Sequence, residues 1–251
     1  GGDPRVAIVL ATYNGARHLQ EQIASLRAQD FADWRLFARD DGSTDGTPEL
    51  LARAAREDPR LSVVESRGNL GVVRNFAALL DHARAAGADL VFMSDQDDVW
   101  LPDKVSRSLA VMAALERRHG AAAPLLVHSD LRVVDDALRP IHPSFLRYQA
   151  IAHQDEAPLG VLLVQNFVTG CASVVNRALL DLALPIPPEG LMHDWWLAQC
   201  AAAGAIGFVP EATILYRQHA ANQIGAGGVV GNLNVLSAQG RKRLRRSWTT
   251  A

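Results

Sequence analysis

Residues 6–15 read Val-Ala-Ile-Val-Leu-Ala-Thr-Tyr-Asn-Gly. The segment Val6–Ala11 is apolar throughout and contains β-branched residues, which favours a strand buried on both faces. Polar and turn-forming residues follow at once. A helical pattern comes next, in which Leu19, Ile23 and Leu26 recur at spacings of four and three. A fully apolar strand followed by an amphipathic helix is typical of a parallel sheet that helices cover on both faces.

The same alternation continues through the N-terminal half of the chain. Expected strands are Trp34–Ala38, Leu61–Glu65 and Leu90–Met93, and expected helices are Pro48–Glu57, Asn75–Ala86 and a long one from Pro102 to about His119. This order predicts an α/β fold with a mostly parallel sheet flanked by helices. In such sheets ligands bind beyond the carboxyl ends of the strands.

The second half is less regular and predicts a mixed sheet. Strands are expected at Leu125–His128, Ala172–Val175, Gly207–Val209 and Thr213–Tyr216, and a helix at Asp194–Ala203. No internal repeat and no Pro- or Ser-rich linker divides the chain. We expect one domain over residues 1–225, with a nucleotide-binding half at about 5–120, an acceptor half at about 121–225, and a Gly-rich connector with a basic tail at 226–251.

The composition narrows the class of protein. The chain has 251 residues, of which 49 % are apolar and 21 % charged, as in globular proteins. No apolar run approaches the roughly 20 residues that span a bilayer, and residues 1–4 show no leader pattern. A net charge of -2 argues against a nucleic-acid partner for the whole protein. Two cysteines without CxxC spacing fit a reducing cytoplasm.

Three polar clusters fall where the expected parallel strands end. They are Thr12–Gly15, Asp40–Asp45 and Asp95–Asp98. The carboxyl ends of parallel strands meet at one edge of the sheet, so these clusters predict a binding site there.

Asp95, Asp97 and Asp98 place three carboxylates within four residues. Carboxylates this close repel one another unless a cation neutralises them, and oxygen ligands suit Mg²⁺ or Mn²⁺. The alternative is a solvated acidic turn that caps the helix beginning near Pro102. The cluster at Asp40–Asp45 also has a functional and a structural interpretation. Its carboxylates bind a base or ribose, or it is a turn whose side chains bond their own backbone.

Four motifs occur in a fixed order, and together they resemble one family. They are Thr12–Gly15, Asp40–Asp45, Asn69–Gly71 with Arg74-Asn75, and Ser94–Pro102. Over about residues 5–220 the chain resembles the family-2 inverting glycosyltransferases of GT-A fold. The variant Asp-Gln-Asp-Asp-Val-Trp most resembles the branch that contains rhamnosyltransferases of bacterial surface polysaccharides, such as the O-antigen of lipopolysaccharide.

The resemblance implies roles for individual residues. The donor would contact Thr12, Tyr13, Asn14, Asp41, Asn69, Arg74 and Asp95. Within this set Asp41 would face the pyrimidine ring, Arg74 the sugar-phosphate, and Asp95 the ribose and donor sugar. Asp97 would be the main ligand of a divalent metal, Mn²⁺ or Mg²⁺, and a late histidine, His219, would complete the metal site. No role is assigned to Asp98.

Asp194 resembles the family's catalytic base because it stands at an expected helix start. The reaction needs a group that takes the proton of an acceptor hydroxyl. The alternative is a helix-capping aspartate beside a core tryptophan pair. Trp195, Trp196 and Trp100 are candidate acceptor contacts, and no role is assigned to His193.

The expected activity is transfer of a sugar to a glycan or lipid-linked acceptor, in the cytoplasm. The first candidate donor is dTDP-L-rhamnose and the second is a UDP-sugar. Arg241–Arg246 contains five basic residues in six and would suit an anionic membrane surface, or it is a solubilising tail. A non-catalytic nucleotide-sugar binding module is the alternative function. The first strand is not followed by GxGxxG, and no GxxxxGK[ST] occurs, which argues against dinucleotide and P-loop enzymes.

Overall fold

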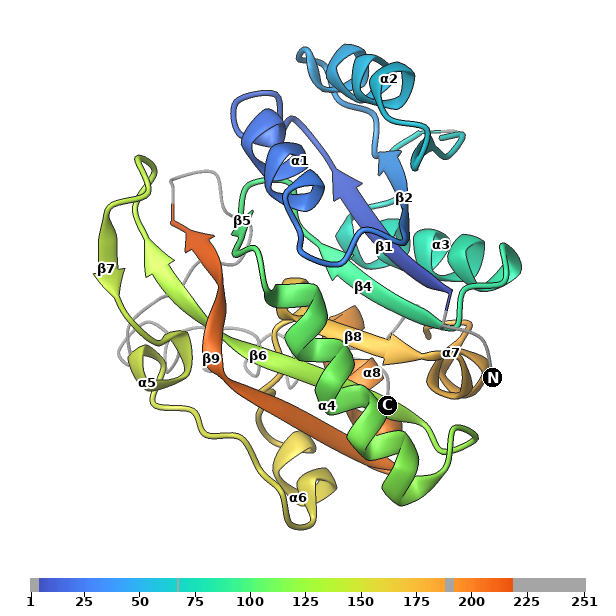
Figure 1. The fold of residues 1–251 in the computed structure, drawn as a ribbon, viewed down its shortest axis with the longest axis vertical. Coiled ribbons are helices and arrows are strands. Elements are labelled where there is room, and N and C mark those ends of the chain that lie inside the picture. The colour runs from blue at the N-terminus through green and yellow to red at the C-terminus, as the bar shows by residue number, and fades with distance from the viewer. Residues whose placement is uncertain (1–4, 67, 188–191, 219–251) are drawn as a thin grey trace, which may run out of the picture.

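The structure is a computed structural model that describes residues 5–66, 68–187 and 192–218. Its centre is a nine-stranded sheet of order β3-β2-β1-β4-β8-β6-β9-β5, with β7 paired to β6 (Figure 1). The strands are β1 (Val6–Thr12), β2 (Trp34–Asp40), β3 (Leu61–Val63), β4 (Leu90–Ser94), β5 (Val99–Trp100), β6 (Leu125–Val134), β7 (Pro140–His142), β8 (Ser173–Asn176) and β9 (Ala205–Arg217).

Helices cover both faces of this sheet (Figure 1). They are α1 (Leu19–Arg27), α2 (Thr47–Glu57), α3 (Val72–Ala85), α4 (Lys104–His119), α5 (Phe145–Tyr148), α6 (Pro158–Leu162), α7 (Arg177–Ala183) and α8 (His193–Ala201), with a 3₁₀ turn, η1, at Gly170–Ala172. None of the helices in the described part of the chain is both long and apolar enough to cross a membrane.

The pairing of the strands confirms the predicted change of character along the chain. Strand β1 is parallel to β2 and β4, and β2 is parallel to β3. Strand β8 then runs antiparallel to both β4 and β6, whereas β6 and β9 are parallel. The first half is therefore a parallel α/β sheet, and the second half is mixed.

Two apolar layers explain why the strands carry no polar alternation. Along β1, Val6, Ile8 and Leu10 pack in the layer that also contains buried residues of α1, α2 and α4. Ala7 and Val9 pack in the opposite layer, with residues of α3, α7 and α8. Since successive side chains of a strand point to opposite faces, a strand covered on both faces is apolar at every position.

The last strand differs from the sequence prediction. Gly207–Val209 and Thr213–Tyr216 were expected as separate strands, but Ala205–Arg217 is one strand, β9. Its register against β6 shifts where Ser129 pairs with Val209 and the next residue of β6, Asp130, pairs with Ala212. The intervening Pro210 and Glu211 are absorbed as a bulge, because a proline without an N–H interrupts the ladder but not the extended backbone.

Short strand β5 shapes the edge where the parallel strands end. It pairs antiparallel with the end of β9, through Val99 with Leu215 and Trp100 with Ile214. The loop Asp95–Asp98 therefore runs from the carboxyl end of β4 directly to β5 and is held at both ends. This loop was predicted from sequence to follow a strand, whereas β5 was not predicted.

Gly204 connects α8 to β9 at a point of close backbone approach. A Cβ atom at position 204 would lie 2.2 Å from the carbonyl oxygen of Pro124 and 2.9 Å from its Cδ. We expect Gly204→Ala to lower the free energy of unfolding by about 2 kcal/mol, because overpacked backbone must move. In Gly160→Ala the added Cβ would meet nothing within 4 Å, so that matched variant should unfold like the wild type. Chemical denaturation of both variants is the measurement, and equal stabilities would contradict the steric argument.

Candidate active site

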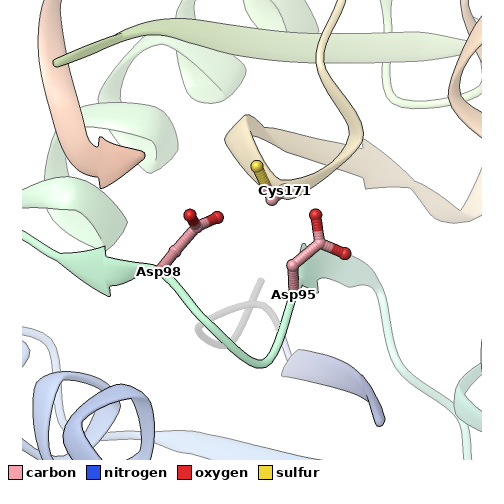
Figure 2. A group of neighbouring side chains, drawn as sticks. All are labelled: Asp95, Asp98 and Cys171. Carbon is pink, nitrogen blue, oxygen red and sulfur yellow. The ribbon is translucent and has the colours of Figure 1, made fainter. Parts of the chain in front are cut away.

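Two carboxylates and a thiol converge beside the loop Asp95–Asp98. One oxygen each of Asp95 and Asp98 and the sulfur of Cys171 all lie within 4.8 Å of one another. Figure 2 shows Asp95 leaving the end of β4, Asp98 entering β5, and Cys171 facing both from η1. We call these three residues the acidic group. They come from the sheet edge at which the sequence predicted a site.

Burial makes this negative charge costly. Burial, together with the charges of Asp97 and Asp194, raises the pKa of Asp95 to about 7. Burial and the carboxylates of Asp97 and Asp95 raise the pKa of Asp98 well above its usual range. Burial, together with the charges of Asp98 and Asp95, also raises the pKa of the Cys171 thiol. Without a further cation, the acidic group therefore holds its protons more tightly than exposed side chains would.

The acidic group fits a divalent metal ion. Oδ2 of Asp98 is buried and lacks a hydrogen-bond partner among the residues that the structure describes, so it is free to coordinate. Carboxylate oxygens suit Mg²⁺ and Mn²⁺, and a cation would remove the repulsion that raises the two aspartate pKa values. Asp95 and Asp98 are thus candidate ligands. Asp97, which the resemblance favours, lies in the same loop, and its role as main ligand stays a prediction.

Two buried cations flank the acidic group. Arg217, at the end of β9, is 2 % exposed; its Nε donates to the carbonyl oxygen of Asp97 at 2.8 Å, and its backbone N–H donates to Asp98 at 3.2 Å. Its guanidinium also bonds Glu21 and the carbonyl oxygen of Asp136. Arg217, the last residue of β9, therefore joins the loop Asp95–Asp98 to α1. We call Asp95–Asp98 the acidic loop.

Lys104 is the second buried cation. It is fully buried at the start of α4, with Nζ 4.6 Å from the centre of the Trp100 ring and without a hydrogen-bond partner in the described ranges. Burial lowers the pKa of Lys104 to about 8, and the charges of Cys171 and Asp98 act in the opposite direction. Lys104 is therefore a second source of positive charge behind the acidic group.

Asp194 lies beside the acidic group, in the first turn of α8. Its Oδ2 accepts the backbone N–H of Gly170 at 3.1 Å, and its Oδ1 accepts that of Trp195 at 2.7 Å. Gly170 permits this approach, since a Cβ there would lie 2.9 Å from Nε2 of His193 and 3.3 Å from Cβ of Asp194. The turn η1 thus positions Asp194 through Gly170 and contributes Cys171 to the acidic group.

The loop after β1 borders the acidic loop. Tyr13 is 42 % exposed, and its backbone bonds the side chain of Gln96. Asn14 accepts the backbone N–H of Thr44 at 2.9 Å. Thr12 is buried, and its hydroxyl donates to Asp40 at 3.0 Å. The contact with Gln96 brings Tyr13 beside Asp95–Asp98, at the sheet edge where the sequence predicted a site. Thr12 and Asn14 instead bond the end of β2 and the turn that follows it.

Asp41 connects the end of β2 to the loop before α3 through hydrogen bonds. It is 2 % exposed and accepts from Arg39 at 2.8 Å and from the backbone N–H groups of Leu70 and Gly71 at 2.7 and 2.8 Å. It therefore holds the loop that contains Asn69 against the end of β2. Contact of Asp41 with a pyrimidine stays a prediction. Arg74 is exposed in the first turn of α3, and its contact with a donor phosphate also stays a prediction.

The three candidate acceptor tryptophans occupy different environments. Trp100 is 2 % exposed and packs against Phe92 in the core, which gives no support to the expected acceptor contact. Trp195 and Trp196 are half-buried, and their indole N–H groups donate to the carbonyl oxygens of Leu162 and Ala183. Both donors are thus used within the fold, as the alternative of a structural tryptophan pair suggested.

Some predicted features fall outside the described residues, and some observed ones were missed. His219, the Gly-rich segment and Arg241–Arg246 all lie outside the described residues. Cys171, Lys104 and Arg217 received no role from the sequence, because a cysteine, lysine or arginine in isolation carries no signal of its partners. Asp98 was visible as an additional acid in the motif, without an assigned role.

Comparison with known proteins identifies the family. The sequence profile described as "Glycosyl transferase family 2" matches residues 7–180. The chain therefore belongs to glycosyltransferase family 2. The dTDP-rhamnosyl transferase RfbG of Shigella flexneri is 25 % identical over 228 residues, which cover 86 % of this chain and 74 % of that protein.

Solved structures support the GT-A fold. S. aureus TarS in complex with UDP-GlcNAc matches with a TM-score of 0.62 and 19 % identity, over 87 % of this chain and 60 % of that one. The mannosyltransferase PcManGT of Pyrobaculum calidifontis, in complex with GDP-Man and Mn²⁺, matches with a TM-score of 0.62 and 20 % identity, over 89 % and 59 %. This chain thus spans about three fifths of each solved chain.

The raised pKa of Asp95 predicts that metal affinity depends on pH. Because that pKa is about 7, a proton must leave before the carboxylate can bind a cation, so Mn²⁺ affinity should increase as the pH rises from about 6 to about 8. Isothermal titration calorimetry with Mn²⁺, in buffers of different ionisation enthalpy, measures both affinity and proton release. Asp95→Asn should bind more weakly and with a flatter pH profile. An affinity that does not change over this range would contradict the prediction.

Proposed function

We propose that this chain is a metal-dependent inverting glycosyltransferase that moves a sugar from a nucleotide diphosphate sugar to a glycan or lipid-linked acceptor. Rhamnose is the first candidate for the sugar. One observation carries the proposal. The acidic group and Asp194 meet at η1, at the edge of a parallel sheet where nucleotides bind in such folds. A site of this kind offers separate carboxylates for a cation and for a proton, as the transfer requires.

Asp194 is the base in this proposal. One of its oxygens takes the proton of the acceptor hydroxyl, whose oxygen forms a bond to the anomeric carbon of the donor sugar. The bond from that carbon to the diphosphate breaks on the opposite face, so the configuration inverts. The N–H groups of Gly170 and Trp195 hold the carboxylate in one orientation, which favours a repeatable proton transfer.

Asp95, Asp97 and Asp98 form the cation side of the site. A divalent cation, when bound, supplies positive charge for the diphosphate leaving group. Arg217 fixes the loop that bears these acids, through the carbonyl oxygen of Asp97 and the carboxylate of Asp98. Asp97 would be the main metal ligand and His219 a further one, with Asp95 and Asp98 as additional candidates.

The donor side of the proposal follows the loops beside the acidic group. Thr12, Tyr13, Asn14, Asp41 and Asn69 would bind the nucleoside. Arg74 would bind the sugar-phosphate. In the relatives, RfbG is named for dTDP-rhamnose and the two solved enzymes hold UDP-GlcNAc and GDP-Man, which supports a nucleotide sugar as the donor class.

Residues 5–120 would form the nucleotide half and residues 121–225 the acceptor half, with Trp195 and Trp196 near the acceptor. Both cysteines are free, which favours a cytoplasmic location. The segment Arg241–Arg246 would bring the enzyme to the inner face of the plasma membrane, where a lipid-linked acceptor is reached.

Asp194→Asn tests the chemistry. Asparagine keeps the shape of the side chain and one oxygen that can accept the N–H of Gly170, and it loses the acceptor for the N–H of Trp195. It cannot take a proton at neutral pH. We expect turnover to fall by about a thousandfold, with affinity for the nucleotide diphosphate unchanged. Release of nucleotide diphosphate from dTDP-L-rhamnose, UDP-GlcNAc and GDP-mannose, each with Mn²⁺, is the assay, and calorimetry measures the affinity.

The matched control is Asp181→Asn, which removes an exposed carboxylate paired with Arg177 on α7. It should turn over like the wild type. Near-normal turnover in Asp194→Asn would reject the base. If the wild type binds nucleotides but releases no nucleotide diphosphate from any donor, a non-catalytic binding module is favoured instead. If the wild type prefers another donor, only the assignment of rhamnose is rejected.

A further inference from the structure

Gln96 stands between two carboxylates of the acidic loop, yet its side chain bonds a different loop. Its Oε1 accepts the backbone N–H of Tyr13 at 2.8 Å, and its Nε2 donates to the backbone carbonyl oxygen of Tyr13 at 2.9 Å. The amide thus satisfies both backbone groups of one residue, as a neighbouring β-strand would. This contact joins positions 83 apart in sequence.

Gly15 provides the space for this amide. A Cβ atom at position 15 would lie 2.2 Å from Oε1 of Gln96, 2.4 Å from Cδ and 3.0 Å from Nε2. No real Cβ approaches heavy atoms so closely, so any side chain at position 15 would displace the amide from Tyr13. The glycine is therefore matched to the glutamine by packing.

The loop of Tyr13 is also fixed from its other side. The N–H of Asn14 donates to Oγ of Ser43 at 2.8 Å, and the N–H of Ala16 donates to Asp45 at 3.0 Å. These bonds tie the loop to the turn after β2. Gln96 supplies the corresponding tie toward Asp95 and Asp97, so the loop is held between the ends of β2 and β4.

We propose that Gln96 is a positioning residue that sets the spacing between the loop of Tyr13 and the acidic loop. This inference rests on the proposed function, in which Tyr13 binds the nucleoside and the acidic loop serves the diphosphate. A nucleoside diphosphate must reach both at once, and a spacing fixed before binding avoids an ordering cost during it. The residue between the two acids thus acts on donor affinity without touching the donor.

A double-mutant cycle tests the proposal with Gln96→Ala, Gly15→Ala and the double variant. Calorimetry measures affinity for UDP and for dTDP, each with Mn²⁺. We expect Gln96→Ala to weaken binding by about tenfold, the effect of losing two backbone hydrogen bonds that order the loop. Gly15→Ala should weaken it as much, because its methyl group expels the amide. The double variant should be no weaker than Gln96→Ala, because the methyl group then meets no amide.

Two further readouts separate positioning from a general loss of stability. In turnover, the KM for the nucleotide sugar should rise while kcat changes by less than about threefold, as for uniformly lost binding. Gln20→Ala, which removes an exposed glutamine of α1, is the matched control and should bind both nucleotides like the wild type. Wild-type affinity in Gln96→Ala, or effects of the single variants that multiply in the double variant, would overturn the proposal.

Amide hydrogen exchange keeps the test independent of the proposed function. If the wild type binds neither UDP nor dTDP, the proposed function fails for these nucleotides, and the protection of the Tyr13 N–H then decides the role of Gln96. Faster exchange at Tyr13 in Gln96→Ala, with slow exchange retained in the core strands, supports positioning of the loop. Unchanged exchange at Tyr13 overturns it.

Discussion

Negative charge confined at one edge of the sheet is the constraint on which the site depends. Asp95 and Asp98 are held together with Cys171, and Asp97 and Asp194 are close enough to raise the pKa of Asp95. Such crowding persists in a folded protein only if the surrounding structure fixes it. The fold does so by pairing β5 with β9, by seating η1 against the acidic loop, and by placing buried cations behind it.

Most helices and strands and the order of the motifs could be predicted from the sequence, because each depends on residues close together along the chain. An unbroken apolar run such as Val6–Ala11 fixes a strand covered on both faces, and polar residues directly after it mark the edge where the strand ends. The approach of Tyr13 to the loop Asp95–Asp98 follows from the parallel pairing of β1 with β4. Family and fold follow from the same short-range patterns.

The rest of the site depends on contacts that no local pattern records. Arg217 bonds the acidic loop across a separation of 119 positions from Asp98, and Cys171 arrives on a short 3₁₀ turn. A strand interrupted by Pro210 also looks like two strands until its pairing with β6 is known. These features are defined by tertiary packing, so they were missed for physical reasons and not for lack of a motif. The roles assigned to Asp41, Asp97 and Asp194 stay predictions.

The same crowding makes the site suited to a cation. A diphosphate that approaches Asp95, Asp97 and Asp98 brings negative charge toward carboxylates that already resist ionisation. Lys104 and Arg217 offset part of this charge, but both are buried in the fold and Arg217 is committed to backbone and carboxylate partners. A divalent cation bound to these acids would add positive charge at the point where the diphosphate approaches. The carboxylates whose mutual repulsion is unfavourable in this site are, for the same reason, the ones suited to bind a cation.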